Sequence, residues 1–261
     1  MAMDQGLAGK TAIVTGASRG IGLAIAEKLA AEGVNVLLVA RSGDLLSAHA
    51  DRLSRTTPCA AFAADLRDAD AASQAVAAAL ARFGRLDFLV NNAGATKRGD
   101  FATLTDADFH DGFALKFHGT VRMVRASWAA LKETRGAIVN IIGAGGRTAS
   151  GDFTIGGSVN AALFNFTKAI AQPATRDGIR VNGLNPGWIE TDRLKGRLAQ
   201  AAKDKGIDEA TARAQALAEL KVARFGQPAE IADLAAALLG PRFAYVQGAL
   251  IDCDGGLTRA L

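Results

Sequence analysis

A glycine-rich turn near the start of the chain is the first segment whose residues could do chemistry. Residues 15–22 read Thr-Gly-Ala-Ser-Arg-Gly-Ile-Gly and join a short apolar run to a helix-length segment. Gly16 permits a tight turn, and Gly20 and Gly22 let the backbone approach a ligand and let the helix pack on the strand. Because backbone N–H groups at a helix start attract phosphate, this pattern predicts a dinucleotide pyrophosphate site.

The turn resembles the TGxxxGxG fingerprint of the short-chain dehydrogenase/reductase family. Later motifs resemble that family in the same order, over roughly residues 7–257. They are Asp65, Asn91-Asn92-Ala93-Gly94, Asn185-Pro186-Gly187 with Thr191, and Asp252-Cys253-Asp254-Gly255-Gly256. The resemblance implies that Asp65 touches the adenine ring and that the Pro-Gly segment meets the nicotinamide.

The glycine turn, the later motifs and the residues next to them are all expected to contact the cofactor. The residues concerned are Gly16, Ser18, Arg19, Gly20, Ile21, Gly22, Arg41, Ser42, Asp65, Leu66, Asn92, Ala93, Gly94, Pro186, Gly187, Ile189 and Thr191.

The charges after the second predicted strand favour NADP over NAD. An acid at the end of that strand would hydrogen-bond the ribose 2′-hydroxyl and select NAD. Ala40 stands there instead, followed by Arg41 and Ser42, and Arg19 adds a second guanidinium from the glycine turn. Two guanidinium groups suit a 2′-phosphate. One of them could also stack on adenine or face solvent.

The family's catalytic Asn, Ser, Tyr and Lys fall on different residues here. Alignment on Lys116-Phe117-His118-Gly119 places Lys116 at the Asn, and alignment on Asn160-Ala161-Ala162-Leu163 places Gly156 at the Tyr and Asn160 at the Lys. Gly143 stands at the Ser. Losing positioned acid–base catalysis removes roughly 10²–10⁴-fold in rate. Ordinary carbonyl reduction is therefore expected to be slow or absent, and the catalytic residues stay unknown.

The two glycines are expected to vacate volume beside the nicotinamide. The chain has one tyrosine, Tyr245, too far along the sequence to replace the missing one. Polar residues near the altered positions could act as substitutes, although none forms a convincing nucleophile–base pair. They are Lys116, His118, Asp152, Thr154 and Ser158.

Short apolar runs alternate with helix-length segments, which gives the glycine turn the strand before it and the helix after it that a dinucleotide site needs. Strands are predicted at 11–15, 34–40, 60–64, 86–91, 137–142, 179–184 and 249–252, and helices at 21–31, 68–82, 106–131, 158–171 and 230–239. Repeated strand–helix–strand units predict an α/β fold, one doubly wound Rossmann domain over residues 1–261 with helices on both faces of a parallel sheet. Ligands bind beyond the carboxyl ends of such strands.

The Ala-rich, charged stretch 191–225 departs from this rhythm. It predicts one or two exposed helices inserted before the last unit. They could form a solvated flap or a lid over a substrate pocket.

Composition limits the other possibilities. The 261 residues carry a net charge of +4 without a run of basic residues, so we expect no nucleic-acid partner. Cys59 and Cys253 have no metal-ligand spacing, and we expect neither a metal site nor a disulfide. No signal or membrane segment is recognised, which favours a cytoplasmic protein. The resemblance implies a homodimer or homotetramer.

Two functions remain open from the sequence. One is an atypical NADP-dependent oxidoreductase acting on a carbonyl or alcohol through another proton source. The other is a cofactor-binding sensor, scaffold or inactive partner subunit. A non-redox lyase or isomerase on the same fold is a weaker third possibility.

Overall fold

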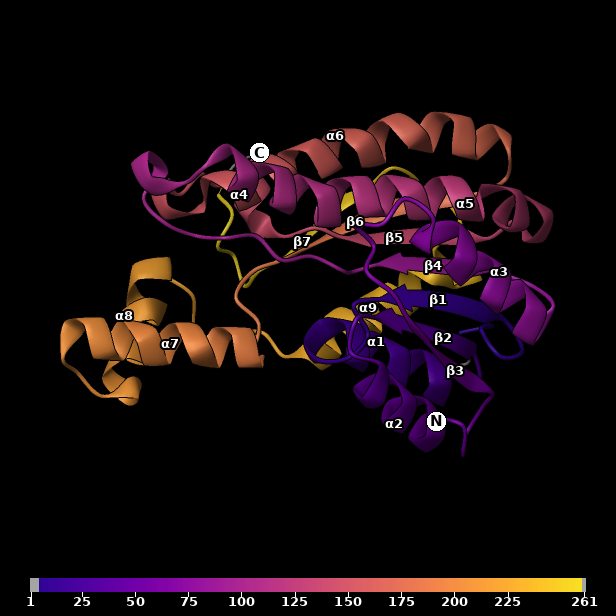
Figure 1. The fold of residues 1–261 in the computed structure, drawn as a ribbon, viewed down its shortest axis with the longest axis horizontal. Helices are drawn as coiled ribbons and strands as arrows, with labels where there is room; N and C mark the ends of the chain where they lie inside the picture. Colours follow the sequence, from indigo (N-terminus) through magenta and orange to yellow (C-terminus); the bar gives the residue numbers. More distant parts are fainter. Residues whose placement is uncertain (1–4, 260–261) are drawn as a thin grey trace.

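The computed structural model describes residues 5–259, and its core is a parallel β-sheet (Figure 1). Its strands are short and mostly buried, as expected for a sheet covered on both faces. They are β1 (Thr11–Thr15), β2 (Asn35–Ala40), β3 (Cys59–Ala63), β4 (Phe88–Asn91), β5 (Ala137–Ile141), β6 (Arg180–Pro186) and β7 (Leu250–Cys253). The predicted strands lie within one or two residues of these bounds.

The helices fill the intervals between the strands. They are α1 (Gly20–Ala31), α2 (Gly43–Leu53), α3 (Ala71–Phe83), α4 (Asp106–Gly112), α5 (Gly119–Thr134), α6 (Thr154–Arg176), α7 (Asp192–Lys205), α8 (Glu209–Leu220) and α9 (Pro228–Leu239). Short 3₁₀ turns lie at Phe101–Thr103, Ala144–Gly146, Gly151–Phe153 and Pro241–Phe243. Among residues 5–259, no helix combines the length and hydropathy of a membrane span.

The strand order creates the position for a ligand. The sheet runs β3-β2-β1-β4-β5-β6-β7, and all its neighbouring strands are parallel. From β1 the chain adds β2 and β3 on one side of the sheet, and from β4 it adds β5, β6 and β7 on the other side. The two exits therefore diverge at the carboxyl ends of β1 and β4, which leaves a crevice at this switch point. This is the predicted doubly wound α/β fold.

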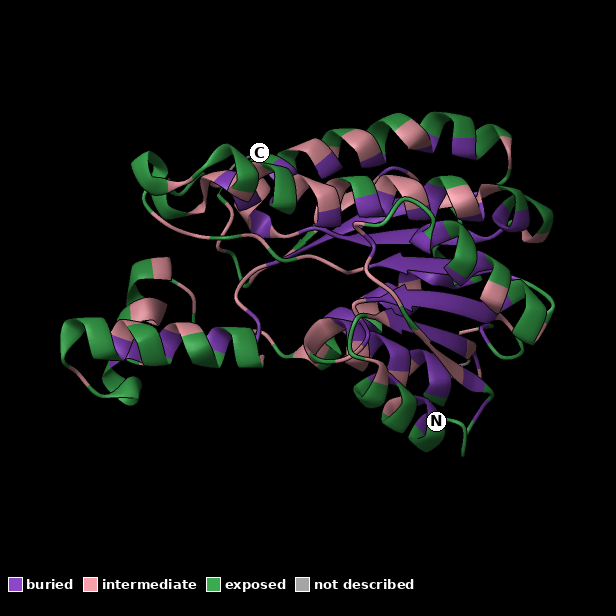
Figure 2. Ribbon diagram, in the orientation of Figure 1, coloured by how far each residue is buried: buried purple, intermediate pink, exposed green. Residues whose placement is uncertain are grey.

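Helices cover both faces of the sheet, and each face has its own apolar core (Figure 2). On one face α1, α2 and α9 pack through residues such as Ile25, Leu46 and Ile231. On the other, α3 and α5 pack with the carboxyl half of α6 through residues such as Val76 and Met123. Burial of such side chains contributes about 1.5–3 kcal/mol each, so the frame around the crevice is well supported.

Three helical segments differ from the sequence prediction. The predicted helix 158–171 is longer at both ends, since α6 spans Thr154–Arg176. The predicted helix 106–131 is α4 and α5 joined by a π-helical segment, Phe113–His118, and π turns often occur at functional sites. Helix α2 was not predicted. Its buried residues Leu46, Ala50 and Leu53 recur at helical spacing, and this spacing could have indicated the helix.

Helices α7 and α8 project from the carboxyl end of the sheet (Figure 1). They pack against each other around a small separate cluster that contains Leu194, Leu198 and Phe225. Trp188 stacks on Phe225, with ring centroids 5.9 Å apart. The stretch 191–225 thus contains two helices with an apolar cluster of their own, and its role as a lid stays a prediction.

Candidate cofactor and active site

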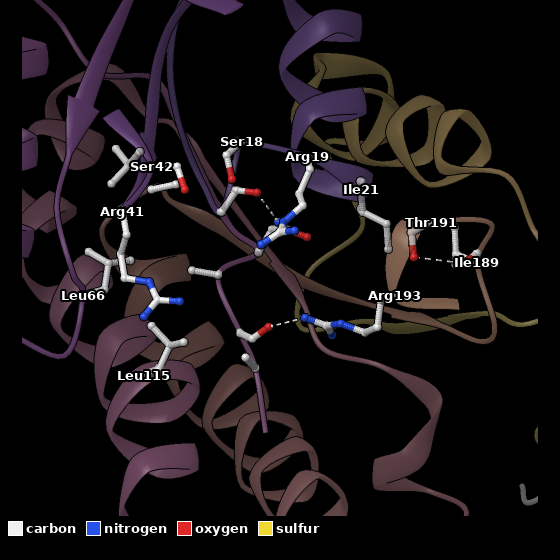
Figure 3. A pocket seen from close by; sticks show the side chains of 18 of the residues that line it. Ser18, Arg19, Ile21, Arg41, Ser42, Leu66, Leu115, Ile189, Thr191 and Arg193 are labelled. Atoms are coloured by element: carbon white, nitrogen blue, oxygen red, sulfur yellow. Dashed lines mark hydrogen bonds between the residues drawn. The ribbon is translucent and has the colours of Figure 1, made fainter. Parts of the chain in front are cut away.

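A cavity of about 400 Å³ occupies the switch point (Figure 3). Its volume lies in the range of small-molecule sites. All the predicted cofactor residues except Gly22, Asp65 and Pro186 line it. They are Gly16, Ser18, Arg19, Gly20, Ile21, Arg41, Ser42, Leu66, Asn92, Ala93, Gly94, Gly187, Ile189 and Thr191.

The glycine turn has the geometry of an anion site. Gly16 and Gly20 have φ angles of +66° and +58°, which favour glycine. A Cβ at Gly22 would lie 2.3 Å from the Gly16 carbonyl oxygen, so Gly22 permits close packing under the turn rather than touching the cavity. Arg19 precedes α1 without capping it through its side chain. The first N–H groups of α1 therefore remain available to a ligand.

The Asn92 turn is fastened to the end of β1. Thr15 Oγ1 accepts hydrogen bonds from the backbone N–H groups of Asn92 and Ala93, at 2.9 and 3.0 Å. The Asn92 side-chain amide donates to the Thr15 and Gly16 carbonyl oxygens, at 3.1 and 3.2 Å. These contacts join segments far apart in the sequence, and they hold the two loops that border the cavity in one fixed arrangement.

Arginines enter the cavity from several sides. Arg41 and Arg193 lie on opposite sides with Arg19 between them (Figure 3). The Arg41 guanidinium lies 3.8 Å from an Asp65 carboxylate oxygen, and its side chain is 64% exposed. Asp65 also pairs with Arg67 at 3.3 Å. Because Arg41 is largely exposed and only loosely paired, it remains available to a phosphate.

Lys116 packs against Gly94, a residue of the cavity wall. It belongs to the π-helical segment, and its aliphatic chain passes so close to Gly94 that a Cβ there would lie 2.8 Å from Lys116 Cδ. Its Nζ donates to the Ile142 carbonyl oxygen at 2.5 Å and to Asn160 Oδ1 at 2.6 Å. Burial, with a smaller effect from the Arg193 charge, lowers the pKa of Lys116 from 10.5 to about 7.

Asn160 links Lys116 to the exit of β5. It is 2% exposed, and its Nδ2 donates to the Gly143 carbonyl oxygen at 3.3 Å. Gly143 has a φ of +125°, a region that residues with side chains rarely adopt. The positions 116, 143 and 160, predicted from three separate segments, are therefore brought together.

Gly156 does not vacate volume. A Cβ at Gly156 would lie 2.1 Å from the Phe153 ring, so that ring already occupies the neighbouring space. At Gly143 a Cβ would meet Asn160 Nδ2 at 3.1 Å. The expected vacancy was wrong at Gly156, because the Phe153 ring fills it, whereas at Gly143 the space is only narrowed by Asn160.

The other polar candidates lie outside this cluster. His118 and Ser158 are exposed. Asp152 is paired with Arg98 at 2.8 Å. Thr154 Oγ1 is buried without a hydrogen-bond partner. Groups of three or more side chains suited to a metal do not occur within residues 5–259.

The cavity wall contains further residues that were not predicted to contact the cofactor, and three of them bear on its chemistry. Trp188, Arg193 and Arg197 line it beside the predicted Ile189 and Thr191. Arg193 donates to the Gly94 carbonyl oxygen at 2.8 Å, so it reaches across the crevice from α7. The spacing of Arg193 and Arg197, one helical turn apart directly after Thr191, could have indicated them.

Comparison with known proteins gives consistent matches. A family model described as enoyl-(acyl carrier protein) reductase matches residues 16–258. Oxidoreductase UcpA from Salmonella typhimurium is 35% identical over 257 residues, covering 97% of this chain and 95% of that protein.

Solved structures match over nearly the whole length. L-sorbose reductase from Gluconobacter frateurii, complexed with NADPH and L-sorbose, has a TM-score of 0.95 and 32% identity, covering 99% of this chain and 100% of the other. Actinorhodin polyketide ketoreductase with NADPH has a TM-score of 0.91 and 31% identity, and both chains are covered completely.

Proposed function

The chain belongs to the short-chain dehydrogenase/reductase family, and from this premise we propose that it is an NADP-dependent oxidoreductase that interconverts a carbonyl compound and an alcohol. The distinctive part of the proposal is that Lys116 exchanges the proton. The contact between Lys116 and Asn160 carries it.

The cavity fits NADP. The free N–H groups at the start of α1 would hold the pyrophosphate. Arg41 and Arg19 would hold the 2′-phosphate, since no acid stands at the end of β2 and the Asp65–Arg41 pair is loose. Similar solved structures contain NADPH, which supports the same choice here. The segment from Gly187 to Thr191 would face the nicotinamide.

Lys116 and Asn160 exchange the family's residue types. By the family pattern an Asn is expected at position 116 and a Lys at position 160. This chain has the Lys on the first segment and the Asn on the second, and their side chains meet at 2.6 Å. An ammonium group thus stays in this part of the site but comes from the opposite helix.

Bound NADPH supplies a hydride for the carbonyl carbon, and the oxygen then needs a proton. With a pKa of about 7, Lys116 is protonated in a useful fraction near neutral pH and is acidic enough to donate. Asn160 Oδ1 and the Ile142 carbonyl oxygen orient Nζ in both protonation states, since amine and ammonium both carry N–H donors. Oxidation of an alcohol uses the neutral amine as the base.

One observation favours cofactor binding without turnover as the second candidate. The Phe153 ring fills the space beside Gly156, where the family has its tyrosine hydroxyl. If Lys116 does not reach the substrate oxygen, the protein would bind NADPH and act as a sensor or partner subunit.

The test compares Lys116→Met and Lys116→Arg with the wild type. NADPH binding is measured by fluorescence titration, and turnover by loss of NADPH absorbance with a panel of ketones and oxo acids. We expect wild-type reduction to decline as pH rises through about 7, because the ammonium form is lost. Both variants should lose roughly 10²–10⁴-fold in kcat while keeping NADPH affinity.

The arginine variant is the sharper control because it keeps the charge but does not release a proton near neutral pH. Variants that retain wild-type kcat and pH profile would refute the role of Lys116. A wild type that binds NADPH but turns over no member of the panel would support the second candidate.

A further inference from the structure

Three arginines lie near one another where α7 borders the cavity, and two of them line it. Arg193 and Arg197 lie one turn apart on α7, and both line the cavity wall. Arg98 follows the turn that contains Gly94, the residue whose carbonyl oxygen accepts the hydrogen bond from Arg193. The three side chains therefore come from two segments that lie on opposite sides of the crevice.

Aromatic rings support two of these guanidinium groups. Arg197 lies over the Trp188 ring at 3.7 Å, and Arg98 lies over the Phe153 ring at 3.8 Å. Stacking on a ring fixes the plane of a guanidinium and leaves its N–H edge free to donate. Two such forks, held in place, suit the planar or tetrahedral oxygens of a carboxylate or phosphate.

One carboxylate, that of Asp152, lies near these three guanidinium groups, so an excess of positive charge remains. Asp152 pairs with Arg98 at 2.8 Å, but within residues 5–259 neither Arg193 nor Arg197 has a carboxylate within ion-pair distance. Burial and the neighbouring Arg98 lower the pKa of Arg197 to about 10, and burial with Arg19 and Arg98 lowers the pKa of Arg193. Like charges that are partly desolvated together destabilise one another unless an anion joins them.

Other groups are available to the cofactor phosphates. The start of α1 faces the pyrophosphate position, and Arg41 lies across the cavity from Arg193 (Figure 3). Arg98 and Arg197 lie instead beside Phe153 and Trp188, and Phe153 packs on Gly156 near the cluster formed by Lys116 and Asn160. This places the unbalanced charge at the reacting end.

We propose that Arg98, Arg193 and Arg197 bind an anionic group of the substrate, a carboxylate or a phosphate, and so direct its carbonyl or alcohol carbon toward the nicotinamide. The proposal rests on the proposed oxidoreductase function. It adds the class of substrate, namely oxo or hydroxy compounds that carry an acid group.

A binding experiment tests the site without turnover. The melting temperature is followed against increasing sodium acetate or sodium phosphate at constant ionic strength, with saturating NADP present. The wild type is compared with Arg98→Gln, Arg197→Gln and the control Arg55→Gln, which changes an exposed arginine after α2. We expect one anion to stabilise the wild type and the control, with affinity reduced roughly 10- to 100-fold in the two site variants. The preferred anion distinguishes carboxylate from phosphate.

A turnover experiment uses pairs of compounds that differ in the charged group: 2-oxobutanoate with butanone, and dihydroxyacetone phosphate with dihydroxyacetone. The wild-type kcat/KM should favour the charged member of one pair by roughly tenfold or more. In Arg197→Gln this preference should collapse, whereas the control Arg55→Gln should keep it.

Equal anion affinity in Arg197→Gln and Arg55→Gln, or no anion effect on the wild type, would overturn the proposal. A loss of NADPH affinity in Arg197→Gln with unchanged anion affinity would also overturn it, because the arginine would then serve the cofactor. Failure of the wild type to bind NADPH would instead refute the proposed function. The binding experiment decides the anion site even if no compound is turned over.

Discussion

Replacing Lys116 by methionine should change how the stability of the protein depends on pH. The folded state lowers the pKa of Lys116 from 10.5 to about 7, mainly by burial. Between these two values the unfolded chain holds a proton that the folded protein has released. The free energy of unfolding of the wild type therefore rises with pH across this window, and it receives no such contribution below about pH 7.

The size of the effect follows from the same shift. A fall from 10.5 to about 7 corresponds to about 5 kcal/mol, at about 1.4 kcal/mol per pH unit. The residue as a whole is only half-buried, so solvent screening reduces this energy. We expect the pH-dependent change in the free energy of unfolding to be about 2–4 kcal/mol. Loss of the hydrogen bonds to Ile142 and Asn160 adds a cost of about 1–3 kcal/mol for each acceptor left unpaired, and this cost does not vary with pH.

The assay is urea denaturation of the wild type and Lys116→Met from pH 6 to pH 10. The difference between the two proteins cancels the titration of the other groups. It should stay constant near pH 6 and then grow in favour of the wild type as the pH rises above 7. Lys203→Met, which removes an exposed lysine of α7, is the matched control and should run parallel to the wild type. If the free energy of unfolding of Lys116→Met also ran parallel to that of the wild type, the lowered pKa of Lys116 would be refuted.

Three further changes test other parts of the site. Arg41→Ala should weaken NADPH binding by roughly tenfold or more and NADH binding much less, by fluorescence titration, since it removes a guanidinium suited to the 2′-phosphate; an equal loss for both would contradict this assignment. Gly156→Tyr should destabilise the protein by about 1–3 kcal/mol in urea denaturation, because its Cβ would lie 2.1 Å from the Phe153 ring, and Phe153→Ala should relieve part of this cost; a fully stable single variant would contradict the packing. Gly22→Ala should lower both the melting temperature and NADPH affinity, since its Cβ would lie 2.4 Å from Asn92 Nδ2; an unchanged NADPH dissociation constant would show that the turn tolerates the added carbon.

The frame of the cofactor site could be predicted from sequence because its requirements are local. A tight turn at Gly16, a positive φ at Gly20 and close packing at Gly22 each demand glycine at one position, so the motif is visible in the chain itself. The alternation of buried strands with helix-length segments likewise follows from periodicity, and it determined the parallel sheet and the crevice at its switch point.

The arrangement of side chains around Lys116 and Asn160 depends on tertiary structure. Lys116 and Asn160 are 44 residues apart, and only the packing of the π-helical segment beside α6 brings their side chains to 2.6 Å. The lowered pKa of Lys116 arises from that burial, which residue type alone does not reveal. Phe153 fills the space beside Gly156 because the 3₁₀ turn before α6 directs its ring there. The sequence by itself thus determined the fold and most of the predicted lining of the cavity, whereas contacts between distant segments decided which side chains meet around Lys116 and Asn160, because those contacts depend on how the elements pack.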